Sequence, residues 1–138
     1  MRPPINFNAL PTTVAMANTD VLTGKGMRIQ GRKTASFQMK WASTPTGVFS
    51  FQINNRADAC LPDGTANPAA TGIWTTLVNP TAFTAQQPAG AYPSEPTGTA
   101  AGGVGYFAFA DLSAEWIRPI YKNTSSSGTW TFADGVAE

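Results

Sequence analysis

Apolar and polar residues alternate with a period of two along several short stretches, which is the pattern of half-buried β-strands. The clearest stretch is residues 33–41, where Phe37 and Trp41 fall on one side and polar side chains on the other. Residues 48–54 repeat the pattern around Phe51. Because a Ser-Thr-Pro-Thr-Gly turn joins the two stretches at 43–47, the sequence predicts that they pair as a hairpin.

Three further strands are predicted near the C-terminus. Residues 103–109 and 129–132 alternate, and between them 115–122 places Ile117 and Tyr121 on one side and Trp116 on the other. A short strand is expected at 73–78 around Trp74. Other short strands are expected within 19–31, with Gly24-Lys25-Gly26 as a hairpin turn between them.

Short strands with Gly- and Pro-rich connections, and no stretch of convincing helical period, predict an all-β fold: an antiparallel β-sandwich, jelly-roll-like, with long loops at 55–72 and 79–102. Residues 1–18 are rich in Pro and lack a clear period, so they are expected to form an extended N-terminal arm that precedes a single sandwich domain at 19–138. Arg2, Phe7 and Leu10 are the residues with which this arm would contact a partner. The predicted core consists of Phe37, Trp41, Phe51, Trp74, Phe107, Ile117 and Tyr121.

Charge narrows the classes of partner. Only 12% of the 138 residues are charged, and the net charge of +1 argues against nucleic acid as the main partner. Up to Arg56 the chain has seven basic residues and one acidic residue, and after it two basic and seven acidic. Either the halves intermix in the fold and cancel, or they give a dipolar surface that brings identical subunits together. No apolar run is long enough to span a bilayer, and no signal peptide is visible, so a membrane partner and secretion are not expected.

Candidate chemistry is sparse. The chain has no histidine, which removes Ser-His and Cys-His nucleophile pairs and histidine metal sites. Cys60, the single cysteine, is expected to be inert, and Asp58, Asp63 and Glu95 are expected to be solvated loop carboxylates. We therefore predict no enzymatic activity, no cofactor and no resident metal. Trp116, next to Glu115 and Arg118, is the candidate for an exposed stacking group that could bind a sugar or base.

Several of these segments together resemble a known family. They are the strand at 35–41, the Thr-Pro-Thr-Gly turn, the strand at 48–54, the Trp-centred segment at 73–77, the Ala-Asp-Leu at 110–112, the Trp-Ile-Arg-Pro-Ile-Tyr at 116–121 and the Gly-Thr-Trp-Thr at 128–131. In this order they resemble the small β-sandwich virion proteins of tailed bacteriophages, of the head-decoration or cement type. The resemblance covers roughly residues 34–132, with the long loops as insertions.

The resemblance implies a non-enzymatic structural role on the exterior of the capsid. Such a protein binds between major capsid subunits, commonly as a homotrimer, and stabilises the shell. Two alternatives stay open at this point: a tail, baseplate or fibre-associated adaptor of the same fold, and a carbohydrate-binding module that uses Trp116, Tyr92 or Tyr106 for stacking.

Overall fold

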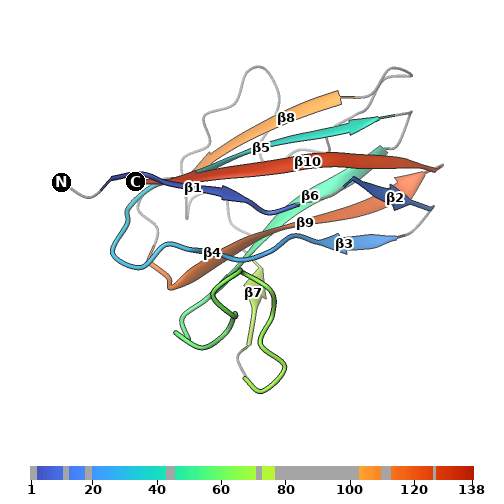
Figure 1. Cartoon of the computed structure of the whole chain (residues 1–138). Helices are drawn as coiled ribbons and strands as arrows, with labels where there is room; N and C mark the ends of the chain where they lie inside the picture. The colour runs from blue at the N-terminus through green and yellow to red at the C-terminus, as the bar shows by residue number, and fades with distance from the viewer. Residues whose placement is uncertain are drawn as a thin grey trace.

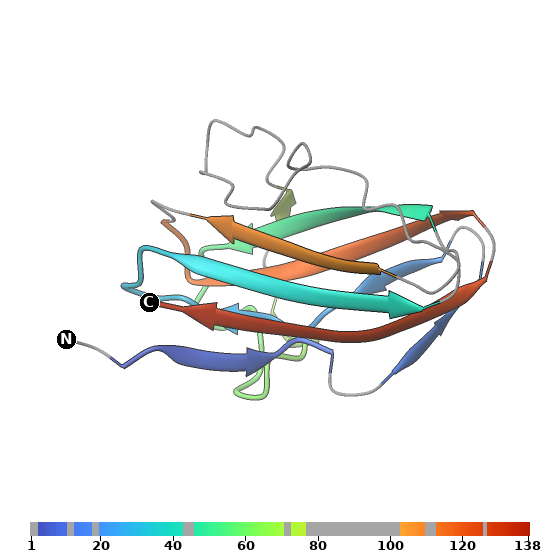
Figure 2. The same ribbon diagram turned by 90° about the horizontal axis from the view of Figure 1, so that it is seen from above.

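The computed structural model is all-β and consists of two antiparallel five-stranded sheets packed face to face (Figures 1 and 2). It describes residues 3–10, 13–17, 20–42, 46–70, 73–76, 103–109, 113–125 and 127–138. Among these residues there is no helix, and their strands pair antiparallel throughout. The predicted all-β sandwich is therefore confirmed.

The first sheet has the order β1-β10-β5-β8, with β2 also paired to β10. Its strands are β1 (Ile5–Asn8), β2 (Val14–Met16), β5 (Ala35–Ala42), β8 (Gly103–Phe109) and β10 (Gly128–Ala137). The second sheet has the order β3-β9-β6-β7, with β4 also paired to β9. It contains β3 (Val21–Thr23), β4 (Met27–Arg28), β6 (Thr46–Asn54), β7 (Thr75–Thr76) and β9 (Trp116–Ser125).

Both predicted hairpins are wrong. β5 pairs with β10 and β8, whereas β6 pairs with β9 and β7, so the connection between β5 and β6 crosses from one sheet to the other. β3 and β4 do not pair with each other either; they lie one after the other along the same edge of β9. The apolar faces of β5 and β6 still meet, but across the interior of the sandwich, whereas β3 and β4 belong to the same sheet.

The N-terminal residues are not an arm. β1 pairs with residues 134–137 of β10 and β2 pairs with residues 128–130, so the segment forms one edge of the first sheet (Figure 1). Leu10 and Met16 are buried in the main core, and Phe7 packs against it. These apolar side chains belong to the sandwich because the edge of β10 offers backbone partners and the core offers cover.

A kink at Ala9 ties the two sheets together along this edge. Its N–H donates to the carbonyl of Ala133 in the first sheet, at 2.7 Å, and its carbonyl accepts from the N–H of Lys25, at 2.8 Å, beside the second. Gly24 in turn donates to the carbonyl of Pro119 at 2.9 Å. One of these bonds thus joins the segment after β1 to the segment between β3 and β4, and the other two bond each segment to a strand of its own sheet.

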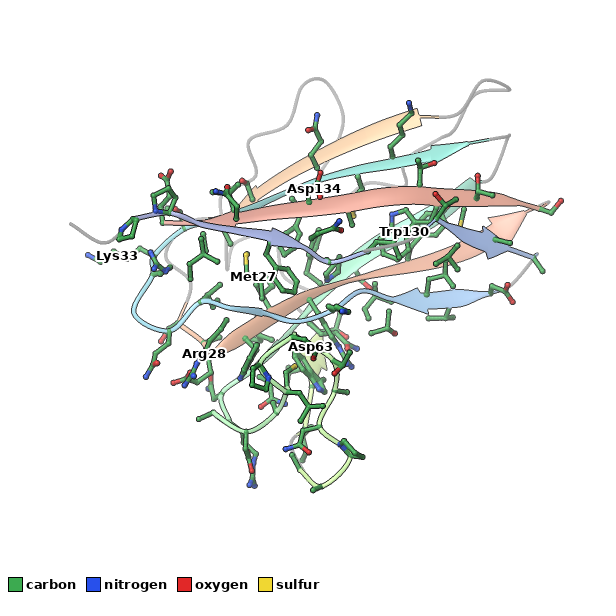
Figure 3. All side chains as sticks on the ribbon, in the orientation of Figure 1. Met27, Arg28, Lys33, Asp63, Trp130 and Asp134 are labelled. Carbon is green, nitrogen blue, oxygen red and sulfur yellow. The ribbon has the colours of Figure 1, made fainter. Side chains whose placement is uncertain are left out.

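The core lies between the sheets and contains four of the predicted members: Phe37, Phe51, Ile117 and Tyr121. Trp130 and Met27 are also fully buried, and Figure 3 shows both between the two layers. The rings of Phe37 and Phe51 come from opposite sheets and lie 5.3 Å apart between centroids. The side chains of Trp41 and Phe107 lie outside the part of the chain that the structure describes.

Tyr121 gives the fold a dependence on alkaline pH. Burial raises the pKa of Tyr121 from 10.0 to about 12. Between these values the unfolded chain loses the phenolic proton and the folded chain keeps it, so stability present below pH 10 is lost as the pH rises toward 12. We expect the free energy of unfolding to fall above pH 10 with a slope of up to about 1.4 kcal/mol per pH unit from this group.

The measurement is urea unfolding between pH 8 and 11.5 for the wild-type chain and for Tyr121→Phe. The phenylalanine variant should lose this part of the slope. A wild-type chain whose stability falls no more steeply than that of the variant would mean that Tyr121 titrates normally in the fold.

Candidate functional site

The loop that follows β6 is an ordered layer over the outer face of the second sheet. Residues Asn55–Ala70, here called the covering loop, project from the sandwich beside β7 (Figure 1). Ala59 and Cys60 of this loop and Trp116 of β9 form a second buried cluster, separate from the main core, and Trp74 packs against it. The cluster gives the sheet apolar cover on the face that the alternation pattern assigns to solvent.

Local hydrogen bonds give the covering loop its shape. Asn54 Oδ1 accepts from the N–H of Arg56 at 2.8 Å, and Asp63 Oδ1 accepts from both the N–H and the hydroxyl of Thr65, at 3.0 and 2.6 Å. A β-bridge joins Cys60 to Ala66 across the turn between them. Short polar side chains that bond to the backbone two residues on are characteristic of turns, so the sequence of the loop specifies most of its own conformation.

Trp116 is buried, and the prediction of an exposed stacking group is wrong. Its exposed fraction is 4%, and its indole N–H donates to the carbonyl of Ala57 at 3.2 Å. The alternation along β9 does place Trp116 on the outer face, opposite Ile117. The covering loop then folds back over that face and removes the indole from solvent.

A groove of about 430 Å³ runs between β1, β4 and the covering loop. It is lined by Ile5, Phe7, Gly26, Arg28, Ala57, Cys60, Pro62 and Trp116. Met27 points into the core and its neighbour Arg28 points away from it (Figure 3). The guanidinium of Arg28 bonds Glu115 at 3.3 Å and lies 5.7 Å from the ring centroid of Trp116. The charge at the groove is thus already paired.

Cys60 has the properties of a structural cysteine. Its exposed fraction is 7%, and burial raises the pKa of its thiol, which disfavours the nucleophilic thiolate. A Cβ atom on Gly26 would lie 2.7 Å from the Cys60 sulfur, so the backbone between β3 and β4 packs directly against it.

Arg118 forms the most distinctive polar contact on this face. Its guanidinium lies over Trp74, 3.9 Å from the ring centroid, and its Nε and Nη2 donate to Gln52 Oε1 at 3.0 and 2.8 Å. Burial lowers the pKa of Arg118. Within the described residues no carboxylate lies within ion-pair distance of it. Trp74, predicted for the main core, instead lies half-buried under this guanidinium in the outer layer.

The ion pairs bear on the uneven charge of the two halves. Lys25 lies 3.9 Å from Asp63, Arg28 bonds Glu115, and Arg56 bonds Asp58 at 3.0 Å. Each joins a base from the first half to an acid from the second. The Arg56 hydrogen bonds lower the pKa of the Asp58 carboxyl. Two of the pairs, Lys25–Asp63 and Arg28–Glu115, bring charges from distant parts of the two halves together, as intermixing predicts, while Arg56–Asp58 is a local contact.

A second hollow, of about 410 Å³, opens where β6 meets β7. Ile73 stands at this hollow with 83% of its surface exposed, and Ile53 and Thr75 line it beside Asn55 and Arg56. The exposed isoleucine and the half-buried Ile53 are the two large apolar side chains that line this hollow, and Ile53 also packs against the main core.

The structure brings few of the sequence-predicted site residues together. Phe7 lines the groove, Leu10 is in the core, and Arg2 and Tyr92 lie outside the described residues, as does the side chain of Tyr106. Sequence reasoning missed Gln52 and Ile73. Gln52 faces Arg118 across β6 and β9, a pairing that depends on strand register and leaves no local signal.

The described part of the chain contains no group of three or more Cys, Asp or Glu side chains placed to hold a metal ion, and none of its elements is a long apolar helix that could cross a membrane. Comparison with known proteins gives no matching family model and no similar curated protein.

Proposed function

We propose that this chain is a non-enzymatic structural protein of a bacteriophage virion, a decoration or cement protein. It binds on the capsid exterior, as a homotrimer, between major capsid subunits, and it stabilises the shell. The proposal rests on the resemblance of the strand segments to that class, and the observation in the structure that supports it is the apolar hollow at Ile73.

A cement protein needs a rigid body with an apolar contact surface. The kink at Ala9 bonds to both sheets, and the covering loop packs on the second, so the strands and the loop form one body. An isoleucine with 83% of its surface exposed gains apolar contact only when a partner covers it. We place the contact with the capsid subunit here, because the N-terminal residues that an arm would have offered are used within the sheet.

The described tryptophans give less support to a carbohydrate-binding module. Trp116 and Trp130 are buried, and the Arg118 guanidinium covers one face of Trp74. Sugar stacking needs an open aromatic face.

The test uses shells of the same virion prepared without this chain. We expect the purified protein to be trimeric by light scattering, to co-sediment with the shells and to raise their melting temperature. Ile73→Ser should weaken binding by about tenfold, from the loss of roughly 1–2 kcal/mol of apolar contact at the interface. Val21→Ser is the matched control, because Val21 is also exposed, at 57%, and lies in β3, at the other end of the second sheet from β7. Shells that do not bind the wild-type chain would overturn the proposal.

A further inference from the structure

Arg118 carries a positive charge, and its contacts within the described residues do not pair that charge with an acid. A charged side chain that is partly removed from water is usually paired with an opposite charge, and for arginine a carboxylate is the best-matched partner. Here the contacts are the neutral Gln52 oxygen and the Trp74 ring, whereas Lys25, Arg28 and Arg56 each lie beside an acidic side chain. Arg118 is therefore a half-buried cation without a counter-ion in the described chain.

One edge of this guanidinium also has donors that make no hydrogen bond within the described residues. Nε and Nη2 donate to the same oxygen, and Nη1 makes no hydrogen bond within the described residues. The Arg118 side chain is only half-buried, so the guanidinium keeps part of its surface in contact with solvent. The stacked indole and the two hydrogen bonds to Gln52 fix the orientation of the guanidinium. Because it is already fixed, less conformational entropy is lost when a ligand binds to its remaining donors.

We propose that Arg118 is a carboxylate-binding residue and that it takes an Asp or Glu side chain of the capsid subunit on which this chain sits. The proposal rests on the proposed function and names a contact of that interface. A planar guanidinium with accessible N–H groups matches a carboxylate in shape and charge. A protein side chain is favoured over an acidic sugar, because the guanidinium already covers the Trp74 face on which a sugar ring would stack.

The test is Gln52→Glu, which places a carboxylate of the chain itself beside Arg118. Glutamate at 52 keeps an acceptor oxygen, so the variant should fold with a melting temperature equal to or above that of the wild type. It supplies the missing counter-ion, and binding to shells lacking the chain should weaken by at least about tenfold. Gln38→Glu is the control, because Gln38 is exposed on β5 in the other sheet and makes the same change in net charge.

The outcomes separate the two proposals. A wild-type chain that does not bind shells overturns the proposed function. A wild-type chain that binds, with Gln52→Glu and Gln38→Glu binding equally well, overturns only the role of Arg118. Arg118→Lys keeps the positive charge without the planar fork and should also weaken binding; unchanged binding of this variant would contradict recognition by the fork. Binding to immobilised polyuronic acid that Gln52→Glu abolishes, with shell binding unchanged, would show that the partner is a sugar and not a protein.

Discussion

A chain that lacks residues 1–18 is expected to lose its cooperative fold. The deletion removes β1 and β2, with their backbone hydrogen bonds along β10, and takes Leu10 and Met16 out of the core. Large-to-small changes at such positions cost about 2–5 kcal/mol each, while a whole domain is stable by about 5–15 kcal/mol. The loss of two edge strands and the kink at Ala9 should therefore exceed the stability of the sandwich. Circular dichroism melting and urea unfolding measure it.

Single substitutions in the same segment should give smaller losses of stability. Leu10→Ala and Met16→Ala should each lower the free energy of unfolding by about 2–5 kcal/mol without abolishing the transition. Deletion of residues 1–4, which precede β1, is the control and should leave a cooperative transition. A chain without residues 1–18 that melts as the full chain does would mean that this segment is not part of the sheet in solution, and the arm would return as the partner contact.

Gly64→Ala is expected to be the most damaging single substitution in the covering loop. Gly64 has a φ of 90°, and a Cβ atom there would lie 2.5 Å from the carbonyl oxygen of Gly26 and 2.6 Å from the ring of Phe7. The cost of the left-handed backbone conformation adds to the cost of the steric overlap, and together they should lower the free energy of unfolding by about 2–5 kcal/mol. Because the carbonyl of Gly64 also accepts from the N–H of Gly26, at 2.8 Å, the clash separates the loop from the segment between β3 and β4.

Gly31→Ala is the matched control. Gly31 also has a positive φ, 72°, but it is exposed in a turn, so only the backbone term of about 1–2 kcal/mol applies. Urea unfolding of the two variants separates the cost of the backbone conformation from the cost of the steric overlap. Equal losses of stability would mean that the covering loop does not pack against Gly26 and Phe7 in solution. Tryptophan fluorescence should also shift to longer wavelength in Gly64→Ala, because Trp116 loses its cover.

The covering loop and the Arg118 contact lie next to each other on one face. The loop buries Trp116, the Trp116 cluster packs against Trp74, and Trp74 supports Arg118. Damage at Gly64 is therefore expected to weaken shell binding through Arg118 as well as stability. Measuring shell binding and melting temperature for both variants distinguishes these effects. Gly64→Ala should lower both quantities, whereas Gln52→Glu should lower only shell binding.

The sequence by itself determined the long strands β5, β6 and β9 and the faces of their side chains. The period of two along β5, β6 and β9 placed Phe37, Phe51, Ile117 and Tyr121 on apolar faces, and all four are in the core. It also placed Trp116 opposite Ile117, which is correct. These features are local, because adjacent residues of a strand point to opposite sides whatever the strand pairs with.

Tertiary structure alone decided which strands pair and what covers each face. The sequence of the turn after β5 fits a hairpin as well as a crossing between sheets, and the crossing is evident only from the pairing of β5 with β10 and of β6 with β9. The N-terminal residues lack a clear period because β1 and β2 are short edge strands broken at Ala9. Contacts between residues distant in sequence bury Trp116 and bring Arg118 against Gln52 and Trp74. No local pattern encodes such contacts, because their energy depends on burial and register that exist only in the assembled sandwich.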